Sequence, residues 1–106
     1  MTPEQKEATI TAVTIIREMF EAGQLDSASF HQNLVCLAYD FAVAEELAWA
    51  KKLLLEVPIS YYEKEQPRQC VENPKYAELC LLFSKLIIMN GLVEGELKPN
   101  HPPGIC

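Results

Sequence analysis

The chain has few of the residues that build common catalytic and ligand sites. Its four glycines form no cluster ahead of a helix, which excludes the phosphate-binding loops that need one. Nucleophile elbows of the G-x-S-x-G type, which many hydrolases use, are also absent. The sequence therefore predicts no catalytic residue and no cofactor site, and we expect a protein that is not an enzyme.

Positive charge is scarce as well. Arg17 and Arg68 are the two arginines, the pair Lys51–Lys52 is flanked by glutamates, and the formal net charge is −6. Binding to the phosphates of nucleic acids needs clustered Lys and Arg, so direct nucleic-acid binding is not expected. An acidic chain of this kind suits either plain solubility or a basic partner.

Long apolar runs are missing. The most apolar stretch, Leu79 to Met89, contains Ser84 and Lys85 and is 11 residues long. A membrane-spanning helix needs roughly 20 apolar residues. The opening residues MTPEQKEATI are too polar for a signal peptide. We therefore expect a soluble, cytoplasmic protein that does not bind membranes.

Paired cysteines of the C-x-x-C type are absent. The four cysteines are Cys36, Cys70, Cys80 and Cys106, and neither histidine stands at zinc-finger spacing from them. Cys36 and Cys80 fall in apolar helical stretches, where a thiol behaves as a small hydrophobic group. We favour buried thiols over a disulfide or a metal site. Cys70 and Cys106 lie in stretches that look irregular, so we expect them to be exposed and reactive.

Helical periodicity, by contrast, is abundant from the first residues onward. Thr2, Pro3 and Gln5 have the spacing of a capping box with proline in the first turn. Apolar residues then recur on one face until Gly23, which suits the left-handed residue after a helix. The pattern predicts a helix at residues 3–22.

The stretch after Asp26 carries two apolar stripes. The first consists of Phe30, Leu34, Leu37 and Phe41, and the second of Val43, Leu47, Ala50, Leu54 and Val57. At 100° per residue the centres of the two stripes differ by about 150° around one helix axis. Two helices with a tight turn near residues 42–44 would bury both stripes. One continuous helix buried on two sides is the alternative, because no Gly or Pro marks the turn.

Residues 58–73 interrupt this periodicity. Pro58 and Pro67 argue against a regular helix across the segment, and the residues between them are strongly polar. The sequence therefore predicts a long irregular connection over 58–73. Connections of that length are often functional.

A last helix is predicted at residues 74–90. Asn73 and Pro74 provide a cap and a first helical residue, and Gly91 follows the end. Leu82 and Ile88 lie off the main apolar face of this helix. A helix that is apolar on more than one side is typical of a central position.

These elements together predict an all-α fold. We expect a small antiparallel bundle of three or four helices in a domain over residues 1–91. Residues 92–106 contain three prolines and two glycines, which predicts a mobile, irregular tail.

One segment resembles a known repeat family. Leu34-x2-Leu37-Ala38-x2-Phe41, followed by Ala50, is similar to the front of a tetratricopeptide helical hairpin. The match covers about 25 residues once, whereas such hairpins stabilise one another in stacks. The later small residue and the helix-breaking proline of that family are missing at their usual spacing. We interpret the resemblance as a shared packing pattern.

Two groups of polar residues could suggest chemistry but have structural explanations. His31 lies near Asp26 and Ser27, which we interpret as helix caps and not as parts of a triad. Glu45 and Glu46 are adjacent, so on a helix their side chains would diverge by about 100° and could not share a proton. They fit a solvated helix start.

Three aromatic residues are the candidates for contact with a partner. Trp49 lies off the apolar stripe of its own helix, so its indole faces either a second covering element or a partner. Tyr61 and Tyr62 fall in the polar segment 58–73. Tyrosine and tryptophan are enriched among the residues that anchor interfaces. The alternative for the tyrosines is that one of them folds back onto the core.

We therefore expect a non-enzymatic protein–protein interaction module, such as a small helical adaptor, a chaperone-like protein or a regulatory subunit. One alternative is a structural component that assembles as a homo-oligomer. Another is an acidic inhibitor that occupies a basic site of another protein. The apolar width of residues 43–57 and 74–90 predicts a homodimer in which these helices form the contact.

Overall fold

The computed structural model describes residues 1–90, and the tail predicted at 92–106 lies outside them. All regular structure in the described part is helical. In chain order it consists of α1 (Pro3–Glu21), α2 (Ser27–Val43), α3 (Leu47–Glu56), the π-helical turn η1 (Tyr61–Glu65), α4 (Gln66–Glu72) and α5 (Pro74–Asn90). The all-α class is confirmed. Residues 1–90 contain five α-helices, more than the three or four that the sequence predicts.

Helix α1 begins and ends where its capping residues predict. The Thr2 side chain accepts a hydrogen bond from the Gln5 backbone N–H at 3.1 Å, and the Gln5 side chain accepts one from the Thr2 N–H at 2.9 Å. The helix ends just before Gly23, whose φ of 76° lies in the left-handed region. The prediction of a helix at 3–22 is confirmed to within one residue.

The stretch after Asp26 forms two helices, α2 and α3. They are joined at residues 44–46, where Glu45 has a left-handed φ of 64°. The chain reverses there, so α2 and α3 pack against each other, and most of each stripe faces the core. Val43 of the second stripe is an exception, because it ends α2 and is 55% exposed. The alternative of one continuous helix is wrong. Glycine is the residue that usually adopts this left-handed conformation, but here the position is occupied by glutamate.

The irregular connection predicted at 58–73 is also wrong. Helical backbone runs from residue 59 to residue 72, first through the π-helical turn and then through α4. Pro67 is the second residue of α4 and stands just after the π-helical turn, where the chain changes from π-helical to α-helical hydrogen bonding. Pro58 precedes the helical segment, and the Tyr61 N–H donates to its carbonyl at 3.0 Å. Pro58 therefore stands at the start of the helical segment, and Pro67 stands at the junction of η1 and α4 within it.

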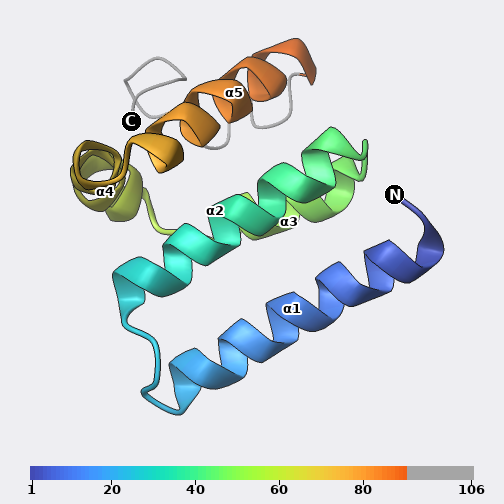
Figure 1. The fold of residues 1–106 in the computed structure, drawn as a ribbon, viewed down its shortest axis with the longest axis horizontal. Helices are drawn as coiled ribbons and strands as arrows, with labels where there is room; N and C mark the ends of the chain where they lie inside the picture. Colours follow the sequence, from blue (N-terminus) through green and yellow to red (C-terminus); the bar gives the residue numbers. More distant parts are fainter. Residues whose placement is uncertain (91–106) are drawn as a thin grey trace.

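Helix α2 occupies the centre of the fold. It contacts α1, α3, η1 and α5, and Figure 1 shows it between α1 on one side and α5 on the other. Its side chains Leu34, Ala38 and Phe41 are fully buried. The prediction that the helix at 74–90 is central is therefore wrong, because α5 lies along one edge of the described fold.

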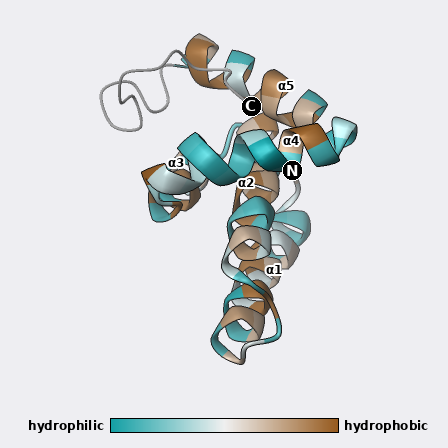
Figure 2. Cartoon of the chain, turned by 90° about the vertical axis from the view of Figure 1, so that its left-hand side faces the viewer, coloured by the Kyte–Doolittle hydropathy of each residue, from teal (hydrophilic) through white to brown (hydrophobic). Residues whose placement is uncertain are grey.

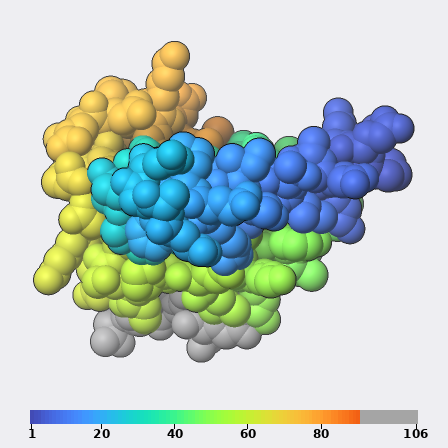
Figure 3. Space-filling view, turned by 90° about the horizontal axis from the view of Figure 1, so that it is seen from below, coloured from blue at the N-terminus to red at the C-terminus, as the bar shows by residue number. Residues whose placement is uncertain are grey.

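Helix α1 lies across another face of the molecule. Figure 3 shows it over α2 and α3, with its N-terminal end projecting beyond them. Val13 is the one residue of α1 that is buried. Two ion pairs join α1 to the two ends of α3. Lys6 Nζ lies 3.1 Å from an oxygen of Glu46, just before α3, and the Arg17 guanidinium lies 2.6 Å from the carboxylate of Glu56, its last residue. The contact of α1 with the core is therefore narrow.

Candidate functional site

A buried polar cluster joins four elements at one end of the fold. The Tyr61 hydroxyl donates to Gln69 Oε1, and it lies 2.7 Å from the Tyr76 hydroxyl, which is therefore placed to donate to the Tyr61 oxygen. Gln69 Nε2 donates to the carbonyl of Ala28 at 3.2 Å. These contacts connect η1, α4, α5 and the start of α2. We call Tyr61, Gln69 and Tyr76 the Tyr61 cluster.

Neighbouring polar groups of the same region are also hydrogen bonded. Gln66 Nε2 donates to the Cys80 sulfur at 3.3 Å, and the Tyr62 hydroxyl donates to the carbonyl of Leu54 at 3.1 Å. In the described residues, every buried side-chain nitrogen or oxygen has a hydrogen-bond partner. A satisfied network of this kind fixes how the core packs, since an unpaired buried polar group would be costly.

Burial controls the protonation of these groups. It raises the pKa of Tyr61, Tyr62 and Tyr76, so all three phenols stay protonated at neutral pH. Burial, together with the charge of Asp40, also raises the pKa of the Cys36 thiol. Proton transfer and thiolate attack need groups whose pKa lies near the working pH. At neutral pH the three phenols and the Cys36 thiol are therefore in their neutral forms.

Cys70 lies inside α4 and is 7% exposed. The expectation that it is exposed and reactive is therefore wrong, because the segment that carries it is a helix packed on the core. Cys106 lies outside the described residues. Within residues 1–90, no group of three or more His, Cys, Asp or Glu side chains is placed to hold a metal ion.

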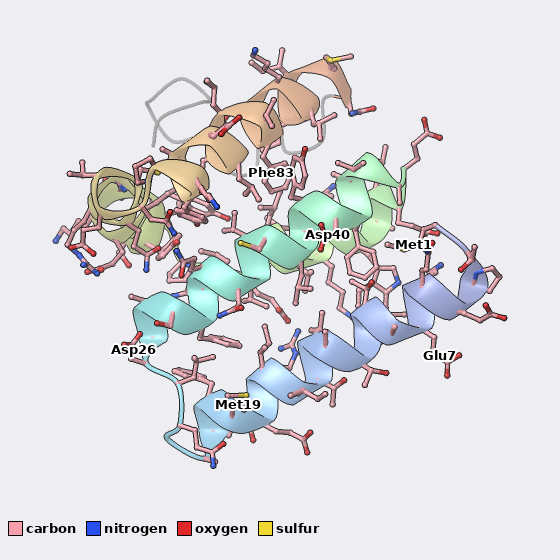
Figure 4. The ribbon with its side chains drawn as sticks, in the orientation of Figure 1. Met1, Glu7, Met19, Asp26, Asp40 and Phe83 are labelled. Atoms are coloured by element: carbon pink, nitrogen blue, oxygen red, sulfur yellow. The ribbon has the colours of Figure 1, made fainter. Side chains whose placement is uncertain are left out.

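Asp26 caps the start of α2, and His31 in its first turns lies near two aromatic rings. Asp26 Oδ1 accepts a hydrogen bond from the Ser29 N–H at 2.7 Å, and Figure 4 labels Asp26 at this end of the helix. The His31 ring lies 5.4 Å from the Phe30 ring and 5.5 Å from the Tyr61 ring, measured between centroids. Burial lowers the pKa of His31. The prediction that Asp26 is a cap is confirmed.

A shallow polar hollow of about 420 Å³ lies between the start of α2 and α4. It is lined by Asp26, Ala28, Ser29, Gln32, Arg68, Gln69, Glu72 and Asn73. Arg68 pairs with Glu72 at 2.8 Å and also with Glu65, while Gln69 belongs to the Tyr61 cluster. Arg68 and Gln69 are thus engaged within the fold.

The three residues predicted to contact a partner face inward to different degrees. Tyr61 is 2% exposed, and Tyr62 is partly buried with its hydroxyl bound to the backbone of α3. Trp49 is partly buried and stacks on the Phe41 ring, with 5.4 Å between centroids. Lys52 Nζ lies 4.8 Å from the centre of the indole. The fold-back alternative holds for both tyrosines.

An exposed apolar surface lies on α5 instead. Leu81, Leu82, Ile88 and Met89 are 51%, 44%, 63% and 79% exposed. Helical geometry places these four residues, which we call the α5 outer face, within an arc of about 120°. The opposite side of the helix is buried, and Phe83 lies between α5 and α2 in Figure 4. Hydrophobic segments recur along α5 in Figure 2.

The sequence contained the signal for this surface. Leu82 and Ile88 lie off the main apolar face of the predicted helix, but a helix that is apolar all round fits a buried position as well as a surface with a binding role. The two possibilities are distinguished by how the helices pack, with α2 in the centre and α5 at one edge of the described fold.

No protein-family model, curated protein or solved structure matches this chain. None of the helices within residues 1–90 combines the length and apolarity that crossing a membrane requires.

Proposed function

We propose that the chain is a non-enzymatic protein–protein interaction module, a small helical adaptor, chaperone-like protein or regulatory subunit, that binds through the α5 outer face. The observation that carries this proposal is the exposure of four large apolar side chains on one side of one helix. Rows of this kind are what helical interfaces use as anchors. The proposed setting is the cytoplasm, where reducing conditions suit the thiols of Cys36, Cys70 and Cys80.

The position of α5 favours binding because the helix is already fixed. Tyr76, Cys80 and Phe83 hold its inner side in the core, so a partner need not order the backbone that it contacts. Burying one large aliphatic side chain contributes about 1.5–3 kcal/mol before the cost of association is subtracted. Four such side chains are enough to anchor a modest interface.

Affinity capture from cell extract tests the proposal with a matched pair of variants. Leu81→Glu introduces a charge on the α5 outer face, and Ile15→Glu does the same on α1 at nearly the same exposure, 49% against 51%. We expect Leu81→Glu to lose the captured protein and Ile15→Glu to keep it, with both variants retaining the helical circular dichroism of the wild type. Equal capture by both variants would overturn the proposal.

A further inference from the structure

The α5 outer face carries two charged residues among its apolar side chains. Glu78 and Lys85 are seven residues apart and therefore lie on the same side of the helix, within the arc that Leu81 and Leu82 span. Both side chains are exposed, and neither forms an ion pair with another residue in the described part of the chain. The acid stands toward the N-terminal end of the face and the base toward its C-terminal end.

We propose that the α5 outer face binds a second copy of this chain, with the two α5 helices antiparallel about a two-fold axis that passes between Leu81 and Leu82. This inference rests on the proposed function and names the partner of the same surface. In that arrangement Glu78 of each copy faces Lys85 of the other, and Leu81 packs against the other copy's Leu82. Ile88 and Met89 then lie over the first turn of the other copy's α5.

Charge complementarity is what selects a second copy. A two-fold interface uses the same patch twice, so opposite charges must stand at equal distances on either side of the axis. Glu78 and Lys85 meet this condition, with the leucine pair between them. A parallel alignment would bring Glu78 against Glu78 and Lys85 against Lys85, which is repulsive. The face therefore specifies both the partner and its direction.

The size of the face sets the strength of association. Helix α5 has 17 residues, and a helix of that length is about 25 Å long. A single pair of such helices buries less than the roughly 800 Å² per partner of a standard interface, so the dimer is weak and exchanges rapidly. The ion pairs lie within the contact, and they contribute register and direction more than affinity.

Sedimentation equilibrium of the full chain tests the contact through charge exchange. Glu78→Lys and Lys85→Glu each replace two attractive contacts per dimer by two repulsive ones, so we expect each variant alone to dimerise roughly tenfold more weakly. Mixing the two variants restores opposite charges at both contacts, and we expect a mixed dimer within a fewfold of wild-type affinity. Added salt should reduce both effects.

Leu82→Glu and Ile15→Glu provide the apolar arm of the same experiment. Leu82→Glu should abolish dimerisation, whereas Ile15→Glu on α1 should leave it unchanged. A wild-type chain that stays monomeric at ~100 µM would overturn the inference, since even small interfaces associate detectably near that concentration. Failure of the mixed charge variants to associate better than either alone would overturn it too.

The outcomes separate this inference from the proposed function. A monomeric wild type whose partner capture is lost in Leu81→Glu overturns the second copy and keeps the interaction module, with the captured protein as the occupant of the face. A dimer that obeys the charge exchange, together with capture that Leu81→Glu does not alter, keeps the second copy and overturns the proposed function.

Discussion

Tyr61 shows how single residues hold this core together. Its hydroxyl contacts two groups, on Gln69 and Tyr76, that are themselves buried. Removing one member of such a set leaves its partners without hydrogen bonds in a place that water does not reach. The stability of this end of the fold should therefore depend on the hydroxyl as well as on the ring.

We expect Tyr61→Phe to lower the free energy of unfolding by about 1–3 kcal/mol, because the side chain of Gln69 and the hydroxyl of Tyr76 lose their shared partner. Tyr39→Phe is the matched control. Its ring packs edge-on against Phe83, with 5.8 Å between centroids, and its hydroxyl bonds to no other residue that the structure describes. Urea denaturation measures both changes, and equal losses in the two variants would contradict the role of the cluster.

The burial of Tyr61 could not be predicted from its neighbours in the sequence. Glu63 and Lys64 follow closely and are exposed, so the local pattern indicates a solvated segment. What turns Tyr61 inward is the π-helical turn that contains it and the Tyr76 hydroxyl fifteen residues later on another helix. Contacts of that range leave no periodic signal along the chain.

Among the elements, the helix termini follow rules that the sequence displays. Thr2, Asp26 and Asn73 each accept a hydrogen bond from the backbone of the turn that they open, and each was recognisable as a cap. The sequence predicts a break at Pro67, but the helical segment from residue 59 to residue 72 continues through Pro67, which stands just after the π-helical turn η1. A proline can thus mark either a break or the end of a π-helical turn. Proline alone does not distinguish the two.

The angle between the two apolar stripes predicts the turn between α2 and α3, but the residue at the centre of that turn is an unusual one. Glu45 has a φ of 64°, a conformation that costs a residue with a β-carbon about 1 kcal/mol or more. We expect Glu45→Gly to raise the free energy of unfolding by about 0.5–1 kcal/mol, because glycine adopts this conformation without strain. The thermal midpoint measures the gain.

Ala44→Gly is the control for this turn. Ala44 has a φ of −86°, which alanine adopts freely, so glycine there adds only flexibility to the unfolded chain and should lower stability. A gain in stability in both variants would mean that the effect comes from greater loop flexibility and not from relief of the left-handed conformation of Glu45.

At the scale of the whole molecule, the helices differ in how much of their surface is buried against the rest of the fold. Helix α2 is covered on several sides, and α5 presents one buried and one open side. Helix α1 inserts Val13 into the core and stacks Phe20 on Phe30 of α2, and it relies otherwise on partly buried side chains and on two ion pairs. Figure 1 shows α1 set to one side of the other helices.

The narrow attachment of α1 has a kinetic consequence. Its backbone amides should exchange with deuterium through detachment of this one helix, while the amides of α2 exchange only when the whole domain unfolds. Arg17→Ala removes the ion pair to Glu56 and should speed exchange in α1 without altering α2. Arg68→Ala, which removes pairs local to the η1–α4 segment, should leave α1 unchanged. Equal protection of α1 and α2 would mean that the N-terminal helix opens only together with the core.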